Sequence, residues 1–373
     1  MRTLRPIAFY LPQFHPIPEN DQWWGRGFTE WTNVTKAKPL FPGHYQPHLP
    51  ADLGFYDLRV PEVREEQARL AVESGLYGFC YYHYWFNGRR ILERPFQEVL
   101  NSGKPDFPFM LCWANENWTR IWDGGENDIL LEQKYSEADD ITHISSLIPA
   151  FNDHRYIKVD GKPVFAIYRS GRIPDIRQTI RTWRNELEKQ GMQVYLCQVE
   201  SFGEKESDFK GSGFDAAIDF QPFSPKLYDY LGGAWSEKIT KMNPVKKFMR
   251  RFQSDKTKEA EVKDFYQMPE YPEYIDHLTK LPITSSYKLY PCITPMWDNT
   301  ARRKKDFFLF RNANPDDYGK WLEHVKSNFK PYSKEENFIF INAWNEWGEG
   351  NHLEPCMQWG SSYLDITKKI LLG

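Results

Sequence analysis

Two glutamates near the carboxyl end of the chain lie three positions apart in a run that is flanked by tryptophans. Residues 342–354 read Asn-Ala-Trp-Asn-Glu-Trp-Gly-Glu-Gly-Asn-His-Leu-Glu, which places Glu346 and Glu349 soon after the apolar stretch 338–341. A glycosidic bond breaks through an oxocarbenium-like transition state, so its catalyst needs one carboxyl for the leaving-group proton and another for the developing positive charge. The pair therefore indicates sugar chemistry, although a strand-ending turn with solvated acids would have the same sequence.

The spacing of the two glutamates restricts the local backbone. On a continuous strand, residues three apart point to opposite faces, whereas in a turn or a first helical turn they share one face. The chain must therefore leave the strand near Glu346 if both carboxylates are to act together. Gly348 and Gly350 suit such an exit, because glycine tolerates unusual backbone angles and lets a substrate approach closely.

Short apolar runs of strand length predict the elements that position these residues. Eight can be counted, at 7–11, 78–82, 109–113, 164–168, 194–199, 216–220, 289–294 and 338–343. Helical patterns separate most of them, at 61–74, 90–100, 137–151, 174–189 and 315–327, with a last one near 361–371. Strands that are apolar on both faces and alternate with helices form parallel sheets covered by helices. The sequence thus predicts an α/β fold, a single closed (β/α)8 TIM-type barrel.

An open, doubly wound sheet is the alternative architecture. Such a sheet usually carries a glycine-rich phosphate loop after its first strand, whereas residues 11–16 read Leu-Pro-Gln-Phe-His-Pro. We therefore expect one barrel domain over 1–373, with insertions at about 12–60 and 223–288 that form long loops at the carboxyl-terminal face. The second insertion contains a basic, helix-like segment at 245–252, which we expect to be an exposed lid helix, with peripheral contact to a membrane or to a phosphate-bearing substrate as the alternative.

Polar and aromatic residues gather where the predicted strands end, which in a barrel of this kind is the active-site face. They are Gln13 and His15 after the first strand, His83 and Tyr84 after the second, Trp113, Asn115, Glu116 and Trp118 at the third, Glu200 and Asp219 at the fifth and sixth, Trp297 and Asp298 at the seventh, and Asn345, Glu346, Trp347 and Glu354 at and beyond the eighth. Charges that served solubility alone would be scattered over both rims. The pattern therefore favours an enzyme over a structural protein.

Two assignments of the reacting acids are open from the residues alone. Glu116, which follows Asn115, would pair with Glu346 as acid/base and nucleophile, an arrangement seen in many retaining barrel glycosidases. Alternatively, the chemistry lies within Glu346 and Glu349.

Composition narrows the classes of ligand. The net charge of -3, from 48 basic and 51 acidic residues, argues against a nucleic-acid partner. Aromatic residues make up 16% of the chain, and their faces stack on sugar rings. The histidines lack the paired spacing of a metal motif, so we predict neither a metal nor another cofactor.

Five widely spaced cysteines indicate reduced core residues. With no export signal and no apolar run near the length of about 20 residues that a spanning helix needs, we expect a cytoplasmic protein without a transmembrane segment.

Four segments resemble the WbsX-like family, which is grouped with glycoside hydrolase family 99. They lie at 8–15, 23–31, 113–118 and 344–350, and they run over nearly the whole chain. The resemblance implies a (β/α)8 barrel with carbohydrate chemistry, and it adds Trp31 to the expected substrate-binding residues. Family 99 usually has His between the Trp and the second Glu of the last segment, and this chain has Gly348 there.

The resemblance also implies a role for each glutamate. Glu346 would be the base that draws the proton from the sugar's 2-hydroxyl, whose oxygen attacks the anomeric carbon to give a 1,2-anhydro intermediate. Glu349 would be the general acid and then the base at the glycosidic oxygen, with retention as the net outcome. Glu116 would then be a sugar-binding or pKa-setting neighbour.

We therefore expect a carbohydrate-active enzyme of surface polysaccharide (O-antigen or lipopolysaccharide) metabolism that cleaves or transfers a glycosyl unit with retention. Its substrate would be an oligosaccharide or polysaccharide, with a lipid-linked form as one option. The first alternative is a glycosyltransferase that uses a sugar nucleotide, bound through Arg89, Arg90 or the basic segment 245–252. The second is a glycan-binding barrel without turnover.

Overall fold

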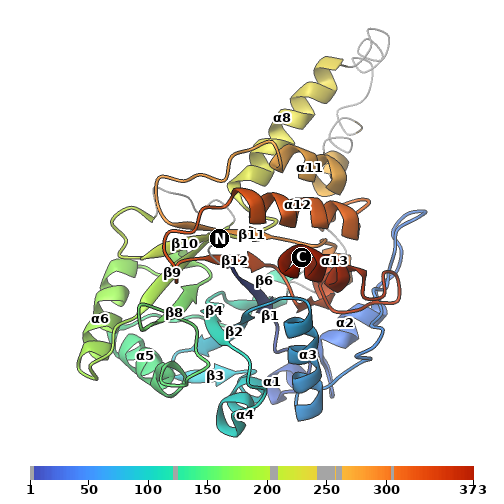
Figure 1. The fold of residues 1–373 in the computed structure, drawn as a ribbon. Coiled ribbons are helices and arrows are strands. Elements are labelled where there is room, and N and C mark those ends of the chain that lie inside the picture. Colours follow the sequence, from blue (N-terminus) through green and yellow to red (C-terminus); the bar gives the residue numbers. More distant parts are fainter. Residues whose placement is uncertain (1–3, 121–124, 202–208, 242–256, 258–262, 304–305) are drawn as a thin grey trace.

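A ring of parallel strands forms the centre of the molecule (Figure 1). The computed structural model describes residues 4–120, 125–201, 209–241, 257, 263–303 and 306–373. The ring strands are β1 (Arg5–Tyr10), β2 (Gly78–Phe86), β4 (Phe109–Trp113), β8 (Lys162–Ile167), β9 (Tyr195–Glu200), β10 (Ala216–Asp219), β11 (Leu289–Ile293) and β12 (Phe338–Ile341). Each pairs in parallel with the next, and β1 pairs with both β2 and β12, which closes the ring. The predicted α/β fold, a (β/α)8 barrel, is confirmed.

Helices cover the outside of the ring. The predicted ones are α3 (Pro61–Glu73), α4 (Arg94–Ser102), α5 (Glu137–Phe151), α6 (Ile176–Glu188), α12 (Pro315–Asn328) and α13 (Ser362–Leu372). α4 begins later than its pattern suggested, because Arg89–Ile91 form β3, which pairs antiparallel with the end of β2. Asn87 and Gly88 between them both have positive φ angles, 46° and 85°, which is the geometry of a two-residue hairpin turn.

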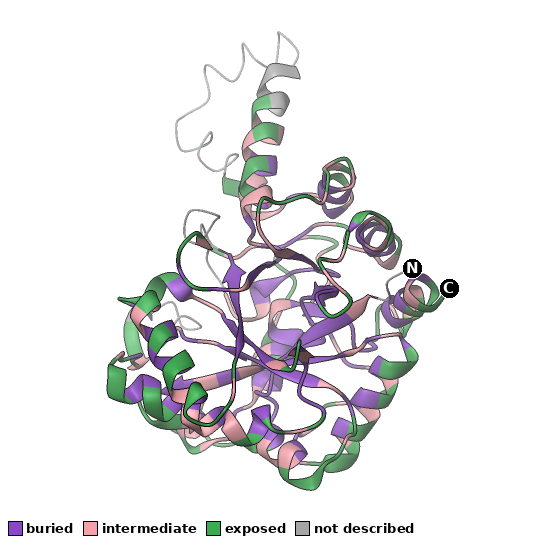
Figure 2. Ribbon diagram, turned by 60° about the vertical axis from the view of Figure 1, so that its left-hand side comes forward, coloured by how far each residue is buried: buried purple, intermediate pink, exposed green. Residues whose placement is uncertain are grey.

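Side chains of the ring strands alternate between the barrel interior and the helices. Inside, the ring of Phe9 lies 5.6 Å from that of Tyr82 and 5.1 Å from that of Phe220. Outside, the ring of Trp113 lies 5.8 Å from that of Trp183 on α6. The strands are buried on both faces, whereas the helices are exposed on their outer sides (Figure 2). A residue's place along a strand therefore decides whether it points into the barrel or under a helix.

The two long connections contain helices that the sequence patterns did not reveal. The first, predicted as a long loop, also has α1 (Pro18–Trp24) and α2 (Glu30–Lys36). The second has α8 (Pro225–Lys241), which projects away from the barrel in Figure 1, and α11 (Tyr271–Leu278). Helices as short as α1 and α2 depend on tertiary packing more than on their own propensity. The basic segment 245–252 lies outside the described residues.

The remaining elements are short. They are the strands β5 (Trp118–Arg120), β6 (Gly125–Leu131), β7 (Lys158–Val159), β13 (Asn345–Glu346) and β14 (Asn351–His352), and the 3-10 helices η2 (Ser170–Arg172), η3 (Asn299–Ala301) and η4 (Trp347–Glu349). All five cysteines are buried and unpaired. Within the described part of the chain, no helix is long and apolar enough to cross a membrane.

Candidate active site

A cavity of about 1050 Å³ opens at the carboxyl ends of the ring strands. Its size suits a ligand of several sugar units, because single small-molecule pockets are commonly about 300–1,000 Å³. The predicted site residues that line it are Gln13, Tyr84, Asn115, Glu116, Trp118, Glu346 and Glu349. The structure thus brings both candidate acid pairs, Glu346 with Glu349 and Glu346 with Glu116, to one cavity.

The local backbone places Glu346 and Glu349 on one side of the chain. β12 ends at Ile341, and β13 then pairs with β14 as a small hairpin whose connection is η4. A 3-10 helix has about three residues per turn, so residues three apart lie above one another. Gly350 ends this turn with a φ of 53°, and a Cβ there would lie 2.9 Å from the Cβ of Asp298. The predicted exit from the strand is confirmed, and it occurs before Glu346.

One guanidinium binds both carboxylates. Nη2 of Arg302 lies 2.9 Å from Oε2 of Glu346, and Nη1 lies 2.8 Å from Oε1 of Glu349. Nε donates to Oε1 of Glu30 at 2.8 Å. The Arg302 side chain, on the loop after β11, is only 13% exposed. Three carboxylates therefore surround one buried cation, and the sequence interpretation had predicted a role in the site for neither Arg302 nor Glu30.

Gly348 makes room for this cluster. A Cβ at position 348 would lie 1.7 Å from Oε1 of Glu30 and 2.7 Å from Nε of Arg302. Both distances are far below van der Waals contact, so no larger residue fits without displacing the Glu30–Arg302 pair. The sequence interpretation had attributed this glycine to unusual backbone angles at the strand exit and to close approach of a substrate. In the structure it is the fully buried Glu30 carboxylate, at the start of α2, that approaches.

Burial and the positive charge of Arg302 have opposite effects on the pKa values of Glu346 and Glu349. Burial raises the pKa of Glu346 to about 8, against the lowering effect of Arg302, with Glu349 and Glu30 raising it further. Burial also raises the pKa of Glu349, and Arg302 again opposes the shift. Burial alone would lower the pKa of Arg302, but the three carboxylates outweigh it and hold that pKa well above its usual value. Arg302 is thus the group that favours the ionised form of both glutamates.

A second set of predicted residues packs around the turn that carries Glu346 and Glu349. Asn345 accepts from the Leu11 amide at 2.7 Å and donates to the Leu11 carbonyl at 3.0 Å, which fixes β13 to the end of β1. The Trp347 ring stacks on that of His352 with centroids 3.7 Å apart. Trp31 packs against Trp347 at 5.4 Å. These side chains are buried, and they hold the turn that carries the glutamates.

Glu354 and Asp298 anchor the same turn through hydrogen bonds. Glu354 accepts from Trp347 Nε1 at 2.6 Å, and burial raises its pKa to about 7. The Asp298 amide donates to the Glu349 carbonyl at 2.7 Å, while its carboxylate binds His44 Nε2 at 2.7 Å and accepts from Gln46 at 2.8 Å. Asp298 therefore ties the first long connection to the loops after β11 and β12.

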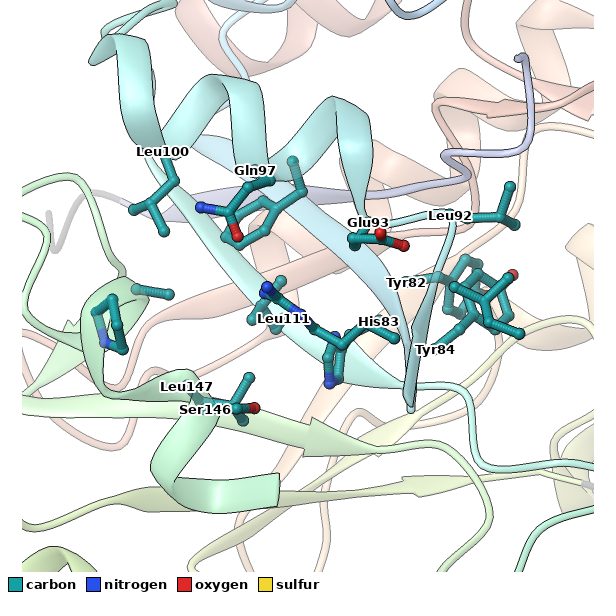
Figure 3. A pocket seen from close by; sticks show the side chains of 15 residues that line it. Tyr82, His83, Tyr84, Leu92, Glu93, Gln97, Leu100, Leu111, Ser146 and Leu147 are labelled. Atoms are coloured by element: carbon teal, nitrogen blue, oxygen red, sulfur yellow. The ribbon is translucent and has the colours of Figure 1, made fainter. Parts of the chain in front are cut away.

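His83 and Trp113 lie behind the barrel wall, away from the large cavity. The strand alternation sends Tyr82 and Tyr84 to the cavity and His83 towards α5, where its Nε2 lies 3.0 Å from Nε2 of His143. His83 borders a separate cavity of about 90 Å³, with Gln97 of α4 and Leu147 of α5 among its neighbours (Figure 3). Burial lowers the pKa of His83 to about 3. In the structure, His83 therefore packs against the surrounding helices.

Four further predicted residues also lie outside the lining of the large cavity. His15 is buried, and its Nδ1 lies 3.0 Å from the Pro12 carbonyl. Glu200 accepts from the hydroxyl of Tyr287 with both oxygens, at 2.6 and 2.8 Å. Asp219 pairs with Lys226, and both border a cavity of about 30 Å³ near α11 and α12. Trp297 is buried against Phe223, with ring centroids 5.0 Å apart.

Several residues of the cavity wall were not among the predicted site residues. They are Trp24, Tyr82, Tyr168, Arg169, Arg172, Arg302 and Arg303. The pair Arg302-Arg303 begins a basic run soon after the Trp297-Asp298 motif, and that position at a strand end was the one available hint. Arg89 pairs with Glu19, and Arg90 borders the smaller cavity, so neither reaches the large one. Across the described ranges, no group of three or more His, Cys, Asp and Glu side chains is arranged to hold a metal ion.

Comparison with known proteins places the chain in a family. Residues 6–367 match the family described as Glycosyltransferase WbsX. Two relatives from strains of Xanthomonas campestris pv. campestris, both described as Uncharacterized protein WxcX, are 40% identical over 367 residues, 98% of this chain and 49% of each relative. The chain therefore spans about half the length of these relatives.

Two solved structures have a fold similar to that of this chain. A glycoside hydrolase-like protein superposes with a TM-score of 0.59 at 14% identity, over 100% of this chain and 94% of that one. The GH99 endo-alpha-mannosidase from Bacteroides thetaiotaomicron gives a TM-score of 0.56 at 13% identity, over 99% and 96% of the two chains. Identities this low establish the fold alone. The chain belongs to the Glycosyltransferase WbsX family, a carbohydrate-active family, and has a barrel like that of family 99 glycoside hydrolases.

Proposed function

We propose that this protein is an enzyme that cleaves or transfers a glycosyl unit with retention, through Glu346 and Glu349. The observation that carries the proposal is the pair itself: a buried and a partly buried carboxylate on one 3-10 turn, both held by one guanidinium in the wall of a large cavity. Aromatic side chains such as Trp118 and Tyr84 line the same cavity and offer faces for sugar rings. A glycan is therefore the substrate class that fits the site.

The proposed reaction has two steps. In the first, Glu346 takes the proton of the 2-hydroxyl, the freed oxygen bonds to the anomeric carbon, the glycosidic bond breaks, and Glu349 protonates the departing oxygen. In the second, Glu349 takes a proton from water or from an acceptor hydroxyl, the incoming oxygen bonds to the anomeric carbon as the bond from that carbon to the 2-oxygen breaks, and the 2-oxygen recovers its proton from Glu346. Two displacements at one carbon give retention.

The different exposure of the two carboxylates supports these roles. The Glu349 side chain is 24% exposed and that of Glu346 is 7% exposed. The group that meets both the leaving oxygen and the incoming water or acceptor needs access to the open cavity, as Glu349 has. The base for a ring hydroxyl can lie deeper, as Glu346 does.

The family description favours transfer to an acceptor, and the same two steps deliver it when a sugar hydroxyl replaces water in the second step. Hydrolysis and transfer would thus share one pair of acids. A role in surface polysaccharide assembly and a cytoplasmic location stay predictions from the sequence.

The test is a screen of oligosaccharides with wild type, Glu346→Gln and Glu349→Gln, in which NMR follows the anomeric configuration of the product. We expect wild type to release or transfer a retained sugar and each variant to lose about a thousandfold in rate. Glu62→Gln, at an exposed position of α3, is the matched control and should keep full activity. An inverted product, or full activity in either active-site variant, would refute the proposal.

A further inference from the structure

A fully buried carboxylate binds Arg302 at the nitrogen that Glu346 and Glu349 do not use. The Glu30 side chain, at the start of α2, is 0% exposed, and its Oε1 accepts from Nε of Arg302 at 2.8 Å. No described residue offers a hydrogen bond to its Oε2. Buried carboxylates are rarely found without a partner, and here that partner is Arg302. The role of Glu30 therefore lies in what it does to Arg302.

The backbone holds both members of this ion pair in place. The amide of Glu30 donates to the Gln13 carbonyl at 3.0 Å, on the loop after β1, and the amide of Arg302 donates to the Asn299 carbonyl at 3.0 Å, at the end of η3. The backbone at Gly348 lies against the carboxylate, since a Cβ there would lie 1.7 Å from Oε1. The Glu30 carboxylate therefore has a preset position before a ligand binds.

The guanidinium of Arg302 is planar, so an anchor at Nε sets the directions of its two terminal nitrogens. In the observed orientation, Nη2 lies 2.9 Å from Oε2 of Glu346 and Nη1 lies 2.8 Å from Oε1 of Glu349. An arginine without such an anchor often gives two nitrogens to one carboxylate, because that bidentate pair is strong. Glu30 thus favours the arrangement in which each acid receives one nitrogen.

The charges of this cluster do not balance. Three carboxylates surround one guanidinium, so two negative charges are uncompensated when all four groups are ionised. Burial makes such an excess unfavourable, and one proton bound by Glu346 and Glu349 removes one of the two charges. With an uncharged side chain at position 30, the pair would reach the same charge without a proton. Glu30 accordingly raises the pKa of both acids.

The other titratable and charged side chains around the pair do not have this effect. Three tyrosines of the cavity wall interact with it: Tyr82, Tyr84 and Tyr168. Burial raises the pKa of each tyrosine well above its usual value, so all three stay neutral. Arg303 lowers the pKa of Glu349, though less than Arg302 does. Outside the pair itself, Glu30 is the described residue whose charge favours a bound proton on both acids.

We propose that Glu30 is a positioning residue of this site: it directs one terminal nitrogen of Arg302 to each acid, and its negative charge makes the pair retain one proton. Glu30 is not among the residues that line the large cavity, so it acts through Arg302 and through its charge, without touching a glycan. This role rests on the proposed function, because the retained proton is the one that the first step delivers to the leaving oxygen. A Glu30 that only stabilised the fold would affect unfolding and not the ionisation of the pair.

The effect of the charge is tested by an NMR titration of the glutamate carboxyl carbons in the full chain, without substrate. Loss of a signal in Glu346→Gln and in Glu349→Gln assigns the pair. Glu30→Gln keeps an oxygen that can accept from Arg302 and removes the charge, so we expect the pair to lose its proton about one to two pH units lower than in wild type. With a glycan that is turned over, both limbs of the kcat/KM profile should move to lower pH by the same amount.

The matched control is Glu336→Gln. Glu336 is also a buried carboxylate paired with a cation, Lys288, and it lies just before β12, at the end of the barrel opposite the cavity. Its loss should alter stability and leave the titration of the pair where it is in wild type. Thermal unfolding shows whether each variant is folded at the temperature of the titration.

Glu30→Asp tests the direction of the guanidinium separately from the charge. The carboxylate remains, but the shorter side chain withdraws it from Nε, so Arg302 loses its anchor while the pair keeps a negative neighbour. We expect the limbs of the kcat/KM profile to stay within about half a pH unit of wild type and kcat to fall about ten- to a hundredfold.

The outcomes separate this role from the proposed function, because the titration does not require turnover. An unmoved titration of the pair in Glu30→Gln, or an equal shift in Glu336→Gln, would overturn the assigned effect of the charge. Full kcat in Glu30→Asp would overturn the assigned direction of Arg302. A pair that titrates as expected in a protein that turns over no glycan, or a shifted titration with unmoved limbs of kcat/KM, would leave the positioning role standing and refute the proposed function.

Discussion

Arg302 joins Glu346 to Glu349 through the two terminal nitrogens of its guanidinium, at 2.9 and 2.8 Å. The carboxylates belong to the turn after β12, whereas the arginine belongs to the loop after β11. Burial raises the pKa of both acids, and the guanidinium of Arg302 opposes that shift in each. The ionisation of the catalytic pair therefore depends on a residue that takes no direct part in the proposed proton transfers.

Replacing Arg302 should move the pH profile. In Arg302→Gln the carboxylates lose the charge that lowers their pKa values, so the acidic limb of kcat/KM should shift upward by about one to three pH units. Activity at pH 7 should fall, and part of it should return at higher pH. Measurement of kcat/KM from pH 4 to 10 checks this, with Arg181→Gln on the outside of α6 as control. An unchanged acidic limb would show that Arg302 does not set the ionisation of the pair.

Gly348→Ala should damage both stability and activity. The added Cβ would lie 1.7 Å from Oε1 of the buried Glu30 carboxylate and 2.7 Å from Nε of Arg302, so this buried ion pair would have to move. Overpacking of this kind typically costs about 1–3 kcal/mol. Thermal unfolding and turnover measure the effect. Gly232→Ala on α8, where the new Cβ has open space, is the control and should be neutral or slightly stabilising. Equal behaviour of the two variants would contradict the packing described for Glu30.

Glu354→Gln should change how stability depends on pH. The folded pKa of Glu354, about 7, lies above its value in the unfolded chain, so the folded state binds more protons between about pH 4.3 and 7. The contribution of this group is full below the unfolded pKa and is lost as the pH rises through the folded one. Relative to the variant, wild type should lose about 1.4 kcal/mol per pH unit between pH 5 and 7.

Urea unfolding of the two proteins at several pH values checks the Glu354 prediction. Glu62→Gln, which removes an exposed carboxylate on α3, should follow wild type throughout. Parallel curves for wild type and Glu354→Gln would mean that Glu354 does not titrate in this range.

Glu116→Gln decides between the two assignments of the acids. Glu116 is half-exposed and pairs only loosely with Arg169, so we expect its loss to raise KM several-fold and to leave kcat within about threefold of wild type. Steady-state kinetics on a glycan found in the screen provide the measurement. A fall in kcat as large as that of Glu349→Gln would instead make Glu116 the acid/base partner of Glu346.

The barrel could be predicted because its strands are apolar on both faces, a pattern that few other folds produce. Glu346 and Glu349 could also be predicted, because their spacing and the glycines beside them are local features of the sequence. Glu30 and Arg302 are different, because they lie 272 positions apart and meet only through the fold of two loops. Nothing near either residue indicates that they share an ion pair.

Other differences between the predicted and the observed site arise from the direction in which a side chain points. His83 and Tyr84 are neighbours at the end of β2, yet Tyr84 lines the large cavity and His83 packs towards α5. The alternation of a strand requires this, but the sequence alone does not say which member of the pair faces inward. The hairpin between β2 and β3 did have a local signal, in Asn87-Gly88, that the helical pattern of the following residues concealed.

The central claim is that Glu349 protonates the leaving oxygen while Glu346 deprotonates the 2-hydroxyl. Its most direct test compares a natural glycan with a glycosyl fluoride of the same sugar, because fluoride departs without a proton. The account predicts that Glu349→Gln cleaves the fluoride at a rate within about tenfold of wild type, while Glu346→Gln stays inactive on both substrates. If Glu349→Gln fails on the fluoride as completely as on the glycan, or if Glu346→Gln is the variant that recovers, the assigned roles are wrong.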